Sequence, residues 1–269
     1  MNTNISILIP RHELGWRMGL ANMLSKENFS WWHTRRWWVQ ALIAVLIQNG
    51  SLALNLKDNQ RVSVDSVALN FLMMAALFVP IVAVVLAQDA ILGERHSGTA
   101  AWVLSKPLQR PAFILSKLIA YGLGFFVTWV LLPSIIFYFQ IIAAGREGLS
   151  KPGFAGLIGL NYLNLLFYLT LALMLATLFN NRAPVLGISI LVAWAGPMQF
   201  IAQPMQKYVP WLEDILPWKL IAQVGMETPL GGYLALGAPL PTVVPIIATA
   251  LWCVLFIGVA IWCISREEF

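Results

Sequence analysis

The sequence predicts an all-α membrane protein. We expect six transmembrane helices, an amphipathic interface helix before the first, a cytoplasmic connector helix between the second and third, and short re-entrant or surface helices before the sixth. Apolar residues make up 59% of the 269 residues and charged residues 11%, whereas soluble domains average about 25% charged. Several apolar runs reach the roughly 20 residues that a helix needs to cross a bilayer. A soluble protein would need polar faces on its helices, and these runs lack them.

An amphipathic helix is expected within an interface segment that covers residues 11–36. Trp16, Leu20 and Leu24 recur every fourth residue, which is the spacing of one helix face. Polar residues of the same stretch lie mostly elsewhere on the helical wheel, among them Glu13 and Arg17. This pattern is typical of a helix that lies along a membrane surface.

Two arginines follow, inside the tryptophan-rich stretch WWHTRRWW at residues 31–38. Arg35 and Arg36 suit the anionic headgroup layer of a cytoplasmic leaflet, and tryptophan is enriched at membrane interfaces. The alternative interpretation is an ordinary positively charged flank of the first span, with no further role. The sequence alone leaves both open.

The predicted spans are separated by polar segments of very different length. Three prolines, Pro80, Pro133 and Pro197, fall inside spans and are expected to kink them. Residues 204–241 hold many prolines and glycines, are too broken to span, and are expected to form short helices or a re-entrant piece outside the cytoplasm. The six spans are expected at about 37–56, 67–88, 117–144, 157–179, 183–203 and 242–264.

Lysine and arginine counts predict the orientation, because cytoplasmic loops carry the excess. With the N-terminus inside, the cytoplasmic segments hold 11 of the 17 basic residues and the opposite side holds 6. Both termini are therefore predicted in the cytoplasm of a prokaryotic cell, with the chain in the plasma (inner) membrane. No soluble domain or clear internal repeat is present, so residues 1–269 are treated as one transmembrane domain.

Catalytic and metal-binding patterns are missing from the sequence. The three histidines show no metal-ligand spacing, and there is no phosphate-binding G-x-x-x-x-G-K-[ST] loop. Almost no ionisable side chain falls within a predicted span, which argues against a proton-driven carrier. Cys253 and Cys263 are about 15 Å apart along one helix, too far for a disulfide. We expect no catalytic residue, no metal, no cofactor held by this chain and no nucleic-acid partner.

Uncharged polar residues do occur within the predicted spans. Such residues cost free energy in lipid unless they face another helix or a cavity. They either form hydrogen bonds between helices or line a translocation path, and both interpretations stay open. The candidates are Gln48, Asn49, Asn161, Asn164, Gln199 and Gln203.

The segment 89–116 is the one long charged interruption between two apolar runs. Its centre, from Gly98 to Ser105, is expected to form a short helix, with Thr99 as N-cap and Lys106-Pro107 as the stop. A short helix held at the membrane surface between two spans could receive a push from a cytoplasmic protein. A solvated loop is the simpler alternative.

This segment resembles the hallmark region of ABC-2 type permeases, the membrane subunits of ATP-binding cassette exporters, and most of all the branch of NosY-type permeases. Those regions combine an acidic residue, a Gly-Thr pair, an apolar helical patch, a Ser-x-Pro turn, an arginine and a lysine that opens the next span. The residues that carry the resemblance, or stand beside them, are Asp89, Glu94, Arg95, Gly98, Thr99, Leu104, Ser105, Pro107, Arg110 and Lys117.

The resemblance implies a permease subunit that forms a dimer with a second copy or a paralogue. Each permease would dock on a cytoplasmic ATPase subunit that holds ATP and Mg²⁺, and the connector would act as the coupling helix. Membrane lipid and an extracytoplasmic accessory protein are further expected partners. The alternatives from other classes are a self-contained secondary carrier or channel, and a membrane assembly or anchoring protein.

Overall fold

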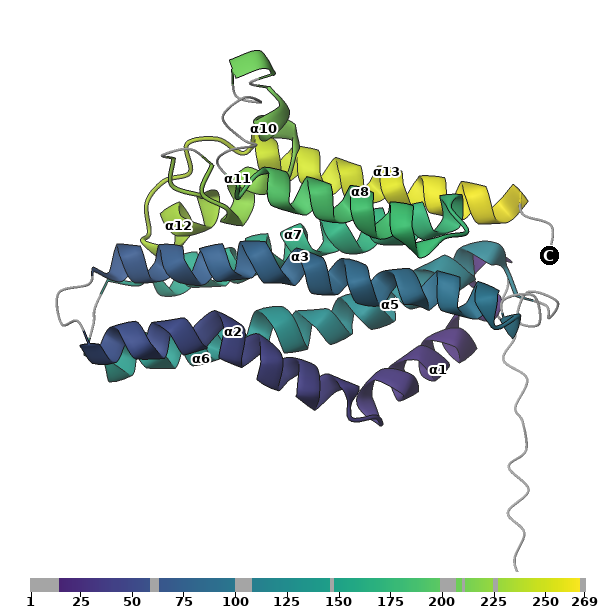
Figure 1. The fold of residues 1–269 in the computed structure, drawn as a ribbon, viewed down its shortest axis with the longest axis horizontal. Helices are drawn as coiled ribbons and strands as arrows, with labels where there is room; N and C mark the ends of the chain where they lie inside the picture. The colour runs from purple at the N-terminus through teal and green to yellow at the C-terminus, as the bar shows by residue number, and fades with distance from the viewer. Residues whose placement is uncertain are drawn as a thin grey trace, which may run out of the picture.

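The computed structural model describes residues 15–58, 63–99, 108–145, 148–198, 207–209, 211–224 and 227–266, and every regular element in these ranges is a helix (Figure 1). The prediction of an all-α architecture is confirmed for this part of the chain. Some of the predicted site residues lie outside the described ranges, so the roles proposed for them stay predictions. They are Glu13, Leu104, Ser105, Pro107, Gln199 and Gln203.

Four helical segments are long and apolar enough to cross a membrane. They are α3 (Val64–His96), the continuous run from α5 (Arg110–Phe125) through the π-helix η2 (Phe126–Leu131) into α6 (Leu132–Ala143), α7 (Lys151–Leu178), and α13 (Val244–Arg266). Several such helices make the chain a multi-pass membrane protein. Two further helices, α2 (Arg36–Asp58) and α8 (Arg182–Ala195), occupy the places of the predicted first and fifth spans. The count of six spans therefore stays a prediction.

The helices next to the charged connector are longer than predicted. α3 continues to His96 and α5 already begins at Arg110, so much of the predicted segment 89–116 is helix. Pro111 stands in the first turn of α5, where its missing N–H costs nothing. The connector between the two helices is reduced to residues 97–109.

The end of α8 also differs from the prediction. The helix stops at Ala195, before the predicted boundary at 203, and Pro197 follows it rather than kinking it. Proline has no N–H to continue the helical hydrogen bonds, which favours a stop at this point.

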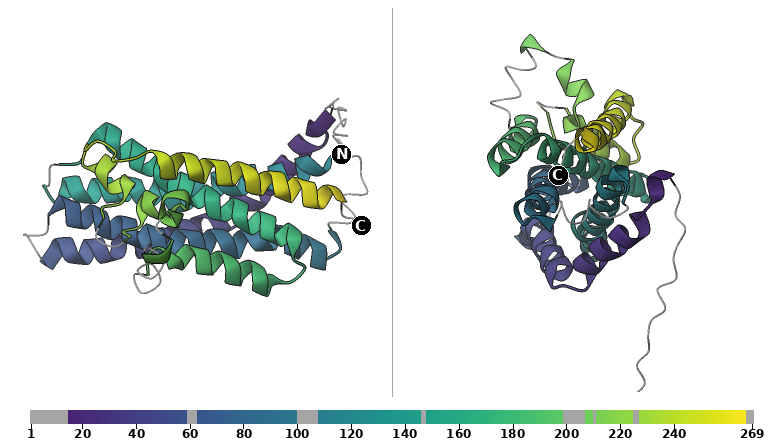
Figure 2. Two further views of the ribbon diagram at one scale, coloured as in Figure 1. Left: turned by 90° about the horizontal axis from the view of Figure 1, so that it is seen from above. Right: turned by 90° about the vertical axis from the view of Figure 1, so that its right-hand side faces the viewer.

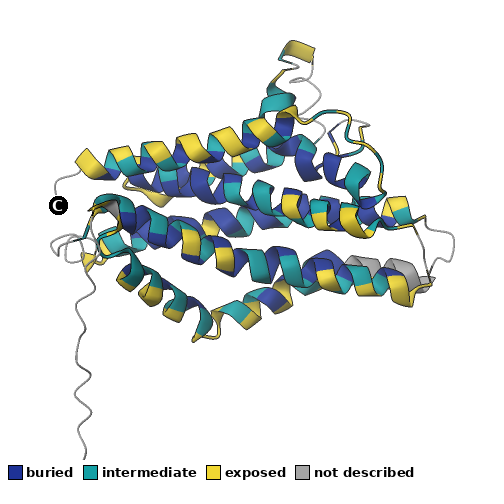
Figure 3. Cartoon of the chain, turned by 180° about the vertical axis from the view of Figure 1, so that it is seen from behind, coloured by how far each residue is buried: buried dark blue, intermediate teal, exposed yellow. Residues whose placement is uncertain are grey.

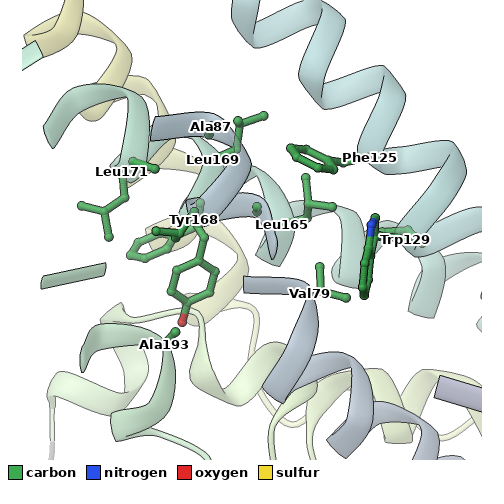
Figure 4. Packing of buried hydrophobic residues seen from close by; sticks show 14 of the residues in the cluster. Val79, Ala87, Phe125, Trp129, Leu165, Tyr168, Leu169, Leu171 and Ala193 are labelled. Carbon is green, nitrogen blue, oxygen red and sulfur yellow. The ribbon is translucent and has the colours of Figure 1, made fainter. Parts of the chain in front are cut away.

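α7 is the central helix of the bundle and packs against α3, α5, α8 and α13. It is apolar around its whole circumference, which is the pattern of a buried helix. Figure 4 shows its Leu165, Tyr168 and Leu169 among side chains of the neighbouring helices. The end-on view in Figure 2 places α1 and α2 on one side of the bundle and α13 on the other.

Three short helices form the segment before α13: α10 (Leu212–Ile215), α11 (Trp218–Ile221) and α12 (Leu230–Ala235). Trp218 donates a hydrogen bond from Nε1 to the carbonyl oxygen of Val192 on α8, at 2.8 Å. α12 lies so close to the start of α7 that a Cβ atom on Gly153 would collide with the carbonyl oxygen of Leu234. Short helices were predicted here, and these contacts hold them on α7 and α8.

Candidate functional site

The charged residues on either side of the connector converge at one end of the bundle. α3 ends at His96, and Gly98 follows two residues later with a φ of +72°, the left-handed conformation that is common just after a helix. The hydroxyls of Ser97 and Thr99 both donate to the carbonyl oxygen of Glu94, at 3.3 and 3.2 Å. These contacts fix the point at which α3 ends, just after Glu94.

Lys117 is the centre of a buried ion cluster. Its side chain is only 1% exposed, and its Nζ lies 3.1 Å from Glu27 Oε1 and 3.0 Å from Glu94 Oε1. The ammonium group also stands over the ring of Phe113, 4.7 Å from the centroid. Lys117 was predicted at the start of the third span. Because α5 already begins at Arg110, Lys117 instead lies two turns inside the helix.

A second lysine completes the cluster from the solvent side. Lys26 Nζ lies 2.8 Å from Glu94 Oε1 and 3.8 Å from Glu27 Oε1. Burial lowers the pKa of Lys26, but its hydrogen bond to Glu94 and the charges of Glu94 and Glu27 outweigh this effect and raise the pKa overall. The cluster thus pairs two ammonium groups with two carboxylates and joins α1, α3 and α5.

The balance of charge matters because both carboxylates are largely shielded from water, with Glu27 8% and Glu94 16% exposed. Removing one partner from a buried pair leaves an uncompensated charge, at a cost of about 3–5 kcal/mol. The cluster therefore favours one relative position of the three helices. It does not follow that it adds much net stability, since apolar replacements of a whole pair are often neutral.

α1 (Leu20–Trp32) runs along α5 over its whole length. The backbone N–H of Gln109 donates to the carbonyl oxygen of Met18 at 3.2 Å where the two segments first meet. Further along, the indole of Trp31 covers Gly124 so closely that a Cβ atom at this glycine would overlap the ring. Trp31 also packs edge-on against Phe125, with centroids 5.0 Å apart. The contacts fasten α1 to α5 at both ends.

A helix, α1, is present within the predicted interface segment, but a different set of residues forms its buried face. Met23, Glu27 and Trp31 are buried, whereas Leu20 and Leu24 are half-buried at the border of this face. Trp16 and Arg17 lie in a preceding 3₁₀ turn, Gly15–Arg17, and the α-helix begins only at Leu20. Glu27 was missed as a functional residue. Its i, i+4 spacing between Met23 and Trp31 would have placed it on the packed face.

On the other side of α3, Arg95 and His96 hold the end of α7. Arg95 donates from Nη1 to the carbonyl oxygen of Ala176 at 2.8 Å and from Nη2 to that of Thr177 at 3.2 Å. A helix leaves its last carbonyl groups without partners, and a cation beside them also opposes the negative end of the helix dipole. His96 Nε2 lies 3.1 Å from the carbonyl oxygen of Asn180, just after α7. The end of α3 is thereby attached to α7.

Two further contacts extend this network to α8 and α13. Asp89 accepts a hydrogen bond of 2.6 Å from Arg182 Nη2, at the first residue of α8. Arg110 donates from Nη1 to the carbonyl oxygen of Ile264 at 2.6 Å, near the end of α13. Five charged residues were predicted as site residues, and each contacts a residue outside its own helix. They are Asp89, Glu94, Arg95, Arg110 and Lys117.

The polar residues predicted within spans divide into two groups. Gln48 is fully buried and donates from Nε2 to the carbonyl oxygen of Trp129 at 3.0 Å. Pro133 cannot supply the N–H that would bond this carbonyl in a regular helix, so the side chain of Gln48 takes its place. Asn49, Asn161 and Asn164 are also buried, and their amide nitrogens form no hydrogen bond with any residue the structure describes. Only Gln48 is therefore explained as a link between helices.

The described residues contain no group of three or more His, Cys, Asp and Glu side chains that could hold a metal ion. The site is instead a set of ion pairs and carbonyl contacts around the two ends of one connector. Its chemistry is suited to holding helices in register. A displacement of the connector would reach six helices through these contacts: α1, α3, α5, α7, α8 and α13.

Comparison with known proteins identifies the family. The model of the family described as "ABC-2 family transporter protein" matches residues 20–269. The chain belongs to the ABC-2 transporter family. It is also similar to a protein of Pseudomonas aeruginosa described as "Probable ABC transporter permease protein NosY", with 23% identity over 222 residues, which cover 74% of this chain and 76% of the relative.

The ABC-2 permease is therefore the membrane subunit of an ABC transporter, as the resemblance of residues 89–117 indicated. Subunits of this family are generally non-catalytic and imply an ATP-binding partner subunit, often with a pair of permeases.

Proposed function

We propose that this chain is the permease subunit of an ATP-driven exporter and that its connector transmits the motion of a separate ATPase subunit to the bundle. ATP and Mg²⁺ would be bound by that partner, and two permeases, identical or paralogous, would form the working assembly in the inner membrane. Both termini and the connector would face the cytoplasm. The export direction is proposed from the family resemblance.

The observation that carries the proposal is the attachment of both connector ends to the same buried cluster. Glu94 precedes the connector and Lys117 follows it, and the two side chains meet at 3.0 Å. A displaced connector would therefore move α3 and α5 together, and Glu27 would pass the displacement to α1. A bundle with two stable arrangements can be biased in this way if the ATPase binds the connector differently in its two states.

The unpartnered amides fit a bundle that has more than one arrangement. Asn49, Asn161 and Asn164 are buried at the depth of the spans without hydrogen bonds from their amide nitrogens to described residues. Buried polar groups normally have partners, and an exception calls for an explanation. We propose that these side chains line the translocation path in the other state, together with Gln199 and Gln203.

Partner capture tests the docking of the ATPase on the connector. The tagged permease, co-expressed with its nucleotide-binding subunit, is expected to retain that subunit through purification. Leu104→Asp should abolish capture, because Leu104 belongs to the apolar patch that the resemblance assigns to the groove of the ATPase. Lys151→Asp, at the opposite end of the bundle, is the matched control and should retain the partner. Full capture by Leu104→Asp would contradict the proposal.

A further inference from the structure

The junction between α1 and α2 is a sharp elbow that lies at the predicted edge of the membrane. α1 ends at Trp32 and α2 begins at Arg36. The first span is predicted to begin at residue 37, directly after this junction, so the predicted edge of the hydrocarbon falls at the elbow. Trp31, at the end of α1, packs on Gly124. The elbow therefore lies where lipid headgroups meet acyl chains, on the same side as the connector.

Two cations stand at this elbow. Arg35 and Arg36 are exposed, and neither has a carboxylate within 4 Å among the described residues. The arginines near the connector differ, because their guanidinium groups bond to carbonyl or carboxylate oxygens of neighbouring helices. Those arginines are Arg95, Arg110 and Arg182.

An exposed apolar stripe leads away from these cations along α2. Val39, Leu42 and Leu46 are exposed and share one face of α2. Arg35 directly precedes the helix, and its carbonyl oxygen accepts a hydrogen bond of 3.3 Å from the N–H of Val39. Figure 3 shows the exposed turns on both sides of the elbow. A cationic end and an apolar stripe are thus continuous on one surface.

We propose that this surface binds an anionic phospholipid of the connector-side leaflet, with the phosphate on Arg35 and Arg36 and an acyl chain along Val39, Leu42 and Leu46. Guanidinium groups bond phosphate oxygens in a bidentate manner, and two cations with no carboxylate nearby favour a headgroup of net negative charge. Bound lipid would hold the elbow beside Trp31, and so keep α1 against α5. This proposal does not depend on the direction or partner of transport.

Lipid titration with native mass spectrometry tests the proposal on the detergent-purified full chain. Dioleoyl phosphatidylglycerol should bind more tightly than dioleoyl phosphatidylcholine. The double variant Arg35→Gln/Arg36→Gln should bind phosphatidylglycerol roughly 30-fold more weakly, because each basic residue near the surface contributes about a factor of five. Binding of phosphatidylcholine should be unchanged.

Two controls keep the result interpretable. Arg266→Gln removes an arginine that lies over Trp262 at the end of α13, and it should keep the preference for phosphatidylglycerol. Arg35→Lys/Arg36→Lys retains the charge and should keep part of the preference while showing that the elbow folds. Equal binding of both lipids by the wild-type chain would overturn the proposal. The proposal would also be overturned if Arg35→Gln/Arg36→Gln lost dimerisation but retained the preference for phosphatidylglycerol. That result would show that a second copy of the chain covers this surface.

Discussion

Lys117 and Glu27 meet 3.1 Å apart in the interior of the bundle, although 90 residues separate them in the sequence. Their contact ties the first helix of the chain to the helix that follows the connector. Because Glu94 joins the same ammonium group from the helix before the connector, the three segments share one set of charges. The predictions below follow from this arrangement and from the helix ends around it.

The first prediction concerns the net charge of the cluster. Lys117→Met should lower the free energy of unfolding by about 3–5 kcal/mol, because Glu27 and Glu94 would remain buried without their main partner. Adding Glu27→Gln should recover part of this loss by removing one of the two carboxylates. Thermal unfolding in detergent measures both effects, and equal melting temperatures for the single variant and the wild type would rule out the buried cluster.

The end of α3 gives a second prediction. Apart from its chain neighbours, no described residue places a heavy atom within 4 Å of a Cβ built on Gly98, so a substitution there meets conformational strain and no clash with this part of the chain. Gly98→Ala should cost roughly 1–2 kcal/mol in the left-handed conformation. Gly98→Asn should cost less, because asparagine tolerates this conformation. ATPase activity of the complex, measured for both variants at equal expression, should fall further for alanine, and the reverse order would contradict the assigned turn.

A third prediction links Gln48 to Pro133. Gln48→Leu should destabilise the wild-type bundle by roughly 1–3 kcal/mol, because the carbonyl oxygen of Trp129 would lose its donor. In a Pro133→Ala background the new backbone N–H can bond that carbonyl, so Gln48→Leu should cost clearly less. A double-mutant cycle on melting temperatures measures the difference, and additive effects would show that the two residues do not share this carbonyl.

The raised pKa of Lys26 predicts a loss of stability in alkaline solution. A group whose pKa is higher in the folded state stabilises the fold below its unfolded value of 10.5, and this contribution is lost as the pH rises through the folded value. The wild type should therefore lose more thermal stability than Lys26→Gln as the pH rises above about 10.5 and through the raised pKa. The difference should be small, because Lys26 is 52% exposed and solvent screens its charges. Parallel curves for the two proteins would show that Lys26 does not contribute.

Much of the architecture could be predicted from the sequence, because long apolar runs have few alternatives to membrane helices. The helix ends were less predictable. Gln88 to His96 contains five polar side chains, a composition typical of a loop. Contacts with Arg182, Lys117 and the end of α7 nevertheless hold the charged residues of this stretch within α3. A sequence pattern shows that such a stretch is polar. It does not show which residues of other helices pair with its charges.

The same reason explains which site residues were found. Charged residues beside the connector stood out against apolar surroundings, so Glu94 and Lys117 were identified. Glu27 lies in a stretch of mixed polar and apolar residues, where a single carboxylate is not distinctive. Only the packing of α1 on α5 shows that it is buried. Residues 100–107, which include the proposed docking helix, lie outside the described part of the chain, so Leu104, Ser105 and Pro107 stay predictions.

The most direct test of the account is a distance measurement on the reconstituted complex with its ATPase subunit. A spin label at Asp65→Cys, in a background with Cys253 and Cys263 replaced by alanine, reports the separation of the two permeases at the start of α3, opposite the connector. Addition of ATP and vanadate should shift the distance in the otherwise wild-type protein. The same addition should leave it unchanged in Lys117→Met/Glu27→Gln, which should still bind the ATPase. A full shift in that double variant would show that the motion does not enter the bundle through the cluster of Lys117, Glu27 and Glu94.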